Sequence, residues 1–157
     1  HAPMYTTSGH AGRADEIAAW QPLFDQYKVD IVFSGHNHLY ERFKPMRNGQ
    51  IVEEGKGVGT LYITHGIGGA EFNNGADDPK LVCWYGASNL NKTIGLLITI
   101  NGDNLTGRAI PNLTEVPVDT FQITAPFLDG DYNEDGVVDA EDLGIFSQGW
   151  LDTGLWP

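Results

Sequence analysis

The sequence predicts a mixed α/β domain over residues 1–124, followed by a small acidic module over residues 125–157. Three observations carry this prediction. A helical pattern runs directly into a short β-branched run, as in α/β units. Further β-rich runs follow it, and the acidic residues concentrate at the end of the chain. A length of 157 residues suits one ordinary domain with a small appendage.

The composition excludes several classes of function. No apolar run approaches the roughly 20 residues of a membrane-spanning helix, so no membrane span is expected. A net charge of -12 repels phosphate backbones, so nucleic acid is not an expected partner. The single cysteine, Cys83, allows no internal disulfide. Because the chain starts at His1 without a signal-like pattern, we expect it to be a piece of a longer protein.

The first elements are a helix and two strands. Residues 22–28 predict a short helix, because Pro is favoured at the first helical position and Leu23 and Tyr27 are four residues apart. Residues 29–33 (V-D-I-V-F) predict a buried strand, and residues 60–65 (T-L-Y-I-T-H) predict a second.

The later elements are mostly strands. Residues 70–91 lack a clear pattern and are expected to be irregular. The β-rich runs 93–100 and 105–110 flank a turn-like N-G-D-N and predict a hairpin, and residues 118–123 predict a last strand.

Histidines mark the candidate site. Four of the five lie in the first 38 residues, namely His1, His10, His36 and His38. Gly35-His36-Asn37-His38 directly follows a predicted strand, at the end where α/β sheets assemble sites. Two imidazoles two residues apart in an extended loop can point to one side and suit adjacent metals. An isolated pair of this kind would more often be two surface histidines, but the strand before it and Tyr40-Glu41-Arg42 after it favour metal binding.

These residues resemble the calcineurin-like metallophosphoesterases, most closely the purple acid phosphatase branch. Residues 1–5 (H-A-P-M-Y) are similar to that branch's H-x-P-x-Y segment. Residues 29–42 (V-D-I-V-F-S-G-H-N-H-L-Y-E-R) are similar to its G-H-x-H segment, and residues 62–69 and 94–123 to its later strands. The resemblance implies a β-sandwich flanked by helices, with a dinuclear metal site at the strand ends.

The resemblance also implies roles for single residues. His1 and His36 would ligate one metal and His38 the other, the pair being Fe, Zn or Mn. His10 would stand near the leaving group of a phosphate ester substrate and protonate it. The implied reaction is the hydrolysis of phosphomonoesters.

Parts of the family pattern are missing. The early aspartate, the G-D segment and the G-N-H segment are absent, and with them the bridging carboxylate and the Asn ligand. We therefore expect the C-terminal half of a catalytic domain, inactive when isolated. His65, at the end of a predicted strand, could line the same pocket, but a structural or solvent-exposed histidine is expected there.

The acidic tail carries a second pattern. Residues 119–157 hold nine acids and no base, which suits a solvated tail or a cation site. Residues 131–142 fit a calcium loop with glycine at position 6. Its ligands would be the side chains of Asp131, Asn133, Asp135, Asp139 and Asp142 and the carbonyl oxygen of Val137. Leu143, Phe146 and Trp150 then form the apolar stripe of an exit helix.

A calcium loop with only an exit helix, and with Asp at position 12, resembles a type I dockerin repeat over residues 129–151. Dockerins usually carry two repeats, and Ala140-Glu141 replaces the hydroxyl pair of many cellulosomal ones. The resemblance implies calcium-dependent attachment to a cohesin or cell-surface partner, and a secreted or extracytoplasmic bacterial protein.

Two functions thus remain open. One is a secreted metallophosphoesterase with a dockerin-like tail. The other is a non-catalytic phosphatase-like scaffold that carries a surface or carbohydrate attachment module. The presence of His1, His36 and His38 favours the enzyme.

Overall fold

The computed structural model describes residues 1–9, 14–52, 59–102, 104–113, 116–124, 132–133 and 137–151. For residues 149–151 it describes the main chain alone. Within these ranges the chain forms two helices and nine strands. In chain order they are α1 (Ala14–Gln26), β1 (Ile31–Ser34), β2 (Tyr40–Phe43), β3 (Met46–Arg47), β4 (Gln50–Ile51), β5 (Leu61–His65), β6 (Leu81–Tyr85), β7 (Ile94–Asn101), β8 (Asn104–Pro111), β9 (Asp119–Thr124) and α2 (Ala140–Leu151).

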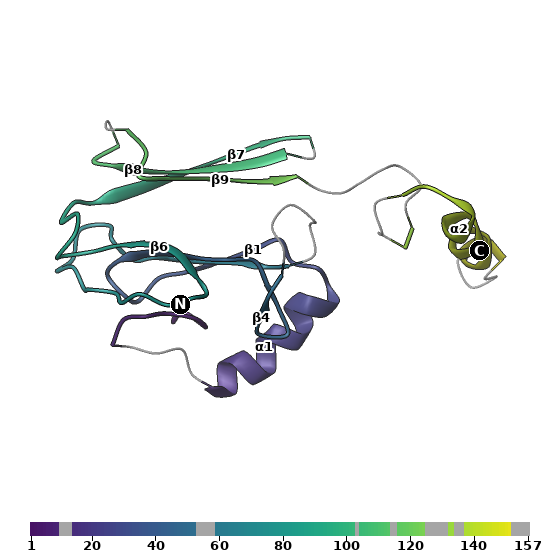
Figure 1. The fold of residues 1–157 in the computed structure, drawn as a ribbon, viewed down its shortest axis with the longest axis horizontal. Coiled ribbons are helices and arrows are strands. Elements are labelled where there is room, and N and C mark those ends of the chain that lie inside the picture. Colours follow the sequence, from purple (N-terminus) through teal and green to yellow (C-terminus); the bar gives the residue numbers. More distant parts are fainter. Residues whose placement is uncertain are drawn as a thin grey trace.

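The strands form two main sheets in separate layers (Figure 1). One sheet has the order β1-β5-β2-β6, in which β1 and β5 are parallel and the other neighbours antiparallel. The other is the antiparallel sheet β7-β8-β9. Helix α1 lies on the face of the first sheet that points away from the second (Figure 1). The predicted mixed α/β class is therefore confirmed.

The core follows the alternation of β5. Because successive side chains of a strand point to opposite faces, Leu61 and Ile63 enter the cluster between the two sheets, with Tyr40 and Phe121. Tyr62 points the other way and joins a second cluster on the side of α1. The first sheet is thus covered on both faces.

A buried ion pair also joins the two sheets. From β2, Arg42 Nε and Nη2 donate to Asp119 Oδ2 and Oδ1 of β9 at 2.7 and 2.8 Å. Tyr40 Oη donates to Asp119 Oδ2 at 2.7 Å, and the Arg42 guanidinium lies 5.3 Å from the centre of the Phe121 ring. Burial alone would raise the pKa of Asp119, but the hydrogen bonds from Arg42 and Tyr40 and the charge of Arg42 outweigh it, so this pKa is lowered.

Helix α1 differs from its prediction. It begins at Ala14, eight residues before the predicted start, and Pro22 lies inside it. The early residues favour this extension, because Asp15 and Glu16 in the first turn complement the helix dipole and the segment is rich in alanine.

The face that α1 turns to the sheet also differs. Leu23 and Tyr27 are 41% and 70% exposed, so they do not form the buried side of the helix. Ile17 and Phe24, seven residues apart, pack against the core instead.

Most predicted strands are confirmed within two residues. Strands β1, β5 and β9 correspond to the predicted strands over residues 29–33, 60–65 and 118–123. Strands β7 and β8 form the predicted hairpin. Four strands were not predicted, namely β2, β3, β4 and β6. Strand β6 (L-V-C-W-Y) lies in the segment that was expected to be irregular, and β2 (Y-E-R-F) was hidden by its two charged residues.

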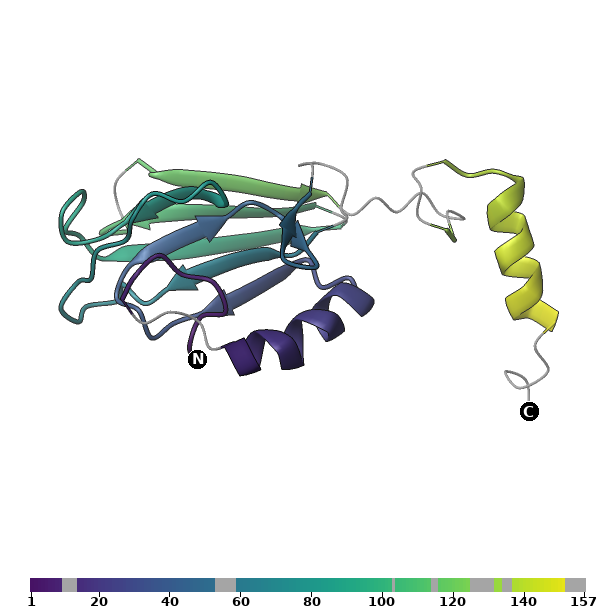
Figure 2. The same cartoon turned by 60° about the horizontal axis from the view of Figure 1, so that its bottom comes forward.

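The predicted exit helix of the tail is present as α2, which stands apart from the two sheets in both views (Figures 1 and 2). Neither helix of the described ranges is long and apolar enough to cross a membrane.

Candidate functional site

Three of the four predicted site histidines lie together. His1, His36 and His38 line one open cleft of about 550 Å³, with Asn73 and His65. Its remaining lining residues are Gly35, Gly66 and Gly68. Residues from the start of the chain and from the loop after β1 thus meet at one place. The fourth, His10, lies outside the described residues.

The loop after β1 makes two successive tight turns. Asn37 N donates to Gly35 O at 2.8 Å, and Leu39 N donates to Asn37 O at 2.9 Å, so His36 and His38 are each the central residue of a γ-turn. His36 has a φ of 63°, which is uncommon for a residue with a side chain. Strained backbone of this kind clusters at functional sites.

The His1 imidazole lies against this loop. Gly35 N donates to His1 O at 2.9 Å, and the ring centres of His1 and His36 are 5.2 Å apart at an interplanar angle of 81°. A Cβ on Gly35 would stand 3.4 Å from the His1 ring, in ordinary van der Waals contact with it. The two imidazoles are near enough to be brought onto one metal ion.

The tautomer of His38 follows from its partner. His38 Nδ1 lies 2.8 Å from the carbonyl oxygen of Glu71, which can only accept, so Nδ1 is the donor and Nε2 is the nitrogen that faces away from this bond. The main chain of His38 is held as well, because its N–H donates to Asn73 Oδ1 at 2.7 Å and its carbonyl accepts from Asn73 N at 2.9 Å. Metal-ligating histidines typically have this arrangement.

His65 lines the cleft and also makes a structural hydrogen bond. Its ring lines the cleft, and its Nε2 donates to the carbonyl oxygen of Ile94 at 2.8 Å. The next residue, Gly66, lies so close to the histidine loop that a Cβ would be 2.0 Å from Asn37 O. The end of β5 and the histidine loop are therefore in direct backbone contact.

These residues fit part of a metal centre. The cleft brings together the imidazoles of His1, His36 and His38. Within the part of the chain that the structure describes, no group of three or more His, Cys, Asp and Glu side chains is close enough to hold a metal.

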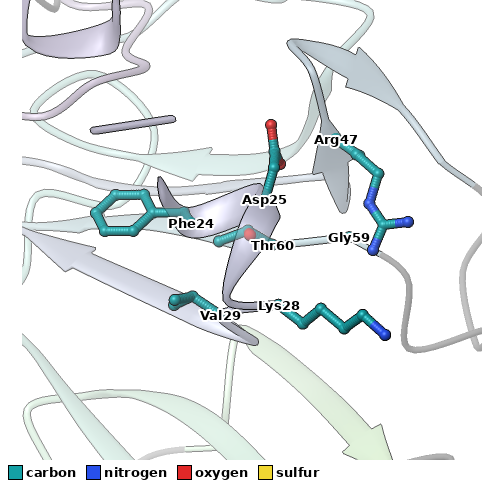
Figure 3. Close-up of a pocket in the computed structure, with 7 residues that line it drawn as sticks. All are labelled: Phe24, Asp25, Lys28, Val29, Arg47, Gly59 and Thr60. Atoms are coloured by element: carbon teal, nitrogen blue, oxygen red, sulfur yellow. The ribbon is translucent and has the colours of Figure 1, made fainter. Parts of the chain in front are cut away.

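A more apolar cavity of about 470 Å³ adjoins the cleft. It shares His1, Gly35 and His65 with the cleft and adds Phe33, Ser34, Leu96 and Ile98 from β1 and β7. Both strands are edge strands of their sheets in the described structure. A separate hollow beside α1, lined by the seven residues drawn in Figure 3, holds only about 10 Å³, which is room for one water molecule.

The described part of the tail is organised around Asp142. Its Oδ1 accepts from Asn133 N at 3.0 Å and its Oδ2 from Asp139 N at 2.8 Å, and the residue is 1% exposed. These backbone N–H groups lower the pKa of the Asp142 carboxyl. Of the predicted calcium ligands, Asn133, Val137, Asp139 and Asp142 are described, whereas Asp131 and Asp135 lie outside the described residues.

The start of α2 is capped and packed. Asp139 Oδ1 accepts from Glu141 N at 2.8 Å, which makes Asp139 the N-cap. The rings of Tyr132 and Phe146 lie 5.4 Å apart. Of the predicted apolar stripe, Leu143 and Phe146 are exposed, and the side chain of Trp150 lies outside the described part of the structure.

Known proteins give this geometry a context. No protein-family model matches the chain. Purple acid phosphatase 21 of Arabidopsis thaliana is 41% identical over 71 residues, which are 44% of this chain and 15% of that protein. Purple acid phosphatase 1 of Ipomoea batatas is 46% identical over 50 residues, or 31% of this chain and 11% of that protein.

A solved structure extends the likeness. The purple acid phosphatase PPD1 from yellow lupin (Lupinus luteus) seeds matches with a TM-score of 0.68 and 23% identity, over 90% of this chain and 26% of that one. The chain is similar to purple acid phosphatases in sequence and fold. It matches only about a seventh of the length of the curated purple acid phosphatase 21. Nothing in these comparisons supports the dockerin resemblance of residues 129–151.

Proposed function

We propose that this chain is the C-terminal part of a metal-dependent phosphoesterase that hydrolyses phosphomonoesters at a dinuclear centre. One observation carries the proposal. His1 and the pair His36 and His38, from segments more than 30 residues apart, line the same cleft, and two of them sit at the centres of successive γ-turns. The similarity to purple acid phosphatases supports it.

The histidines have separate roles. His1 and His36 would hold one ion, and His38 would hold the other through Nε2, because its Nδ1 donates to Glu71 O. When bound, the two ions polarise the phosphoryl oxygens and activate a water for in-line attack. The imidazole of His10 gives a proton to the departing alkoxide.

The remaining ligands come from another part of the protein in this proposal. The cleft contributes histidine nitrogens, and a dinuclear site of this type also needs oxygen ligands. The apolar cavity beside Phe33, Leu96 and Ile98 at the two sheet edges offers a surface against which that part packs. The isolated chain is therefore expected to lack activity.

Metal content tests the proposal. In the parent protein, His36→Ala and His38→Ala should each lower the bound metal by about one ion of the pair and strongly reduce turnover. His65→Ala is a matched control, because it removes an imidazole from the same cleft that is not a proposed ligand. Unchanged stoichiometry and rate in both ligand variants would disprove the proposal.

The second candidate is a non-catalytic phosphatase-like scaffold that carries the attachment module of the tail. A parent protein with intact metal content that hydrolyses no phosphate ester would support this candidate instead.

For the tail we propose a calcium-stabilised module of a secreted or extracytoplasmic protein, which attaches it to a cohesin or cell-surface partner. Asp142 supports this, because its carboxylate already draws the backbone at Asn133 and Asp139 toward the start of α2. Calcium would be held by this carboxylate with Asp131, Asp135 and the other predicted ligands.

Titration of the full chain with calcium tests the tail. We expect binding at about 10⁻⁴–10⁻³ M, as in extracellular modules, with a rise in helicity by circular dichroism and a change in Trp fluorescence. Asp131→Ala is the control. If several millimolar calcium changes neither signal, or the control responds identically, the acidic run is a solvated tail.

A further inference from the structure

We propose that Asn37, Thr6 and Glu41 form a buried hydrogen-bond relay that fixes the histidine loop and thereby sets the metal affinity of the cleft. The effect on metal affinity rests on the proposed function. The relay itself is a property of the protein's own conformation and can be tested without metal.

The relay is continuous. Asn37 Nδ2 donates to Thr6 Oγ1 at 2.7 Å, and the same hydroxyl donates to Glu41 Oε2 at 2.7 Å. Thr6 Oγ1 also accepts from Ser8 N at 3.1 Å, so its one proton and both lone pairs are used. Asn37 and Glu41 are both 0% exposed.

A second residue ties the same segment to Glu41. Thr7 N donates to Glu41 Oε1 at 2.7 Å, and the Thr7 hydroxyl donates to that oxygen as well. Thr7 Oγ1 in turn accepts from Ala76 N at 2.9 Å. The buried carboxylate therefore anchors the segment that follows His1 to strand β2.

The position of these residues makes them a positioning device. Asn37 stands between the two histidines of the loop, Thr6 belongs to the segment that carries His1, and Glu41 lies three residues beyond His38. The start of the chain, the histidine loop and strand β2 are thus joined through one hydroxyl. If that hydroxyl is lost, the buried amide of Asn37 and the carboxylate of Glu41 both lose a partner, which is costly for buried groups.

Strand β2 provides an internal control. Tyr40 and Arg42 point to the other sheet and bind Asp119, whereas Glu41 points to the opposite face and binds Thr6 and Thr7. A variant at Asp119 weakens the hold on the same strand without touching the relay. Effects of the relay can therefore be separated from a general loss of stability.

The test compares Thr6→Val, which removes the hydroxyl and keeps the shape, with Thr6→Ser, which restores it, and with the control Asp119→Asn. In the metal-free full chain, amide hydrogen exchange of Asn37 and Leu39, the donors of the two γ-turns, should be about tenfold faster in Thr6→Val. It should return toward the wild-type rate in Thr6→Ser and be unchanged in Asp119→Asn.

The second arm measures zinc affinity of the parent protein by competition with a chelator. Thr6→Val should bind about 10–100-fold more weakly, with Thr6→Ser and Asp119→Asn near wild type. Unchanged exchange in Thr6→Val overturns the relay. Faster exchange with unchanged zinc affinity overturns its role toward the metal. If exchange responds as expected and the wild-type protein binds no zinc, the relay stands and the proposed function fails.

Discussion

Removing the carboxylate of Asp119 should destabilise the protein severely. The side chains of Arg42 and Asp119 are only 9% and 8% exposed, and the pair is bidentate. Asp119→Ala leaves the guanidinium of Arg42 buried without its partner and takes the acceptor from Tyr40 Oη. Breaking a buried pair from one side costs about 3–5 kcal/mol, a large part of the roughly 5–15 kcal/mol that stabilises a domain.

Urea unfolding and thermal melting of the full chain, followed by circular dichroism, measure this loss. The cost corresponds to a fall in Tm of roughly 6–20 °C for a chain of this size. Thr120→Ala, at an exposed neighbouring position of β9, is the matched control and should stay within about 0.5 kcal/mol. A loss below about 1 kcal/mol in Asp119→Ala would refute the argument from burial.

The pH dependence gives a second check. The folded protein holds the pKa of Asp119 below its usual value. The pair therefore contributes its full stability above the unfolded pKa of about 3.9, and this contribution is lost as the pH falls through the folded pKa. Asp119→Asn should remove this part of the acid sensitivity. An acid-unfolding profile in that variant as steep as in the wild type would contradict it.

Three further predictions concern single positions. Gly66→Ala should lower the free energy of unfolding in urea by about 1–3 kcal/mol, because its Cβ would meet Asn37 O at 2.0 Å. Gly68→Ala, with open space around it, should be near neutral. Equal effects of the two substitutions would be inconsistent with this close approach. Burial raises the pKa of the Cys83 thiol to about 12, so iodoacetamide at pH 8 should alkylate it about a hundredfold or more slowly than in urea; similar rates would contradict its burial. His10→Ala in the parent protein should slow alkyl phosphates more than nitrophenyl phosphate, since only the poor leaving group needs a proton; equal losses would argue for a ligand role.

The sequence predicted what depends on local pattern. The β-branched run of residues 29–33 predicted β1, and the Gly-His-Asn-His that follows was correctly predicted to lie after a strand. The common cleft of His1, His36 and His38 followed from the resemblance of ordered motifs. Local periodicity and motif order were sufficient for both.

The sequence could not predict what depends on distant partners. In Y-E-R-F, two charged residues argue against a buried strand, yet all four residues of β2 are buried. Their partners lie far along the chain, 34 residues away for Thr7 and Glu41 and 77 for Arg42 and Asp119. A single-sequence pattern contains no sign that these charges are compensated, and so β2 was missed.

The same strand explains how the fold and the cleft depend on each other. Its alternation sends Arg42 into the layer between the sheets and Glu41 toward the segment of His1. On one face of β2, Asp119 of β9 accepts hydrogen bonds from Arg42. On the other face, Glu41 accepts hydrogen bonds from Thr6 and Thr7 near the start of the chain. Both networks join segments that are far apart in the sequence. A shift of β2 by one residue would exchange the two faces and break both networks at once. The register of this short strand therefore fixes the packing of the two sheets and the position of the histidine loop together.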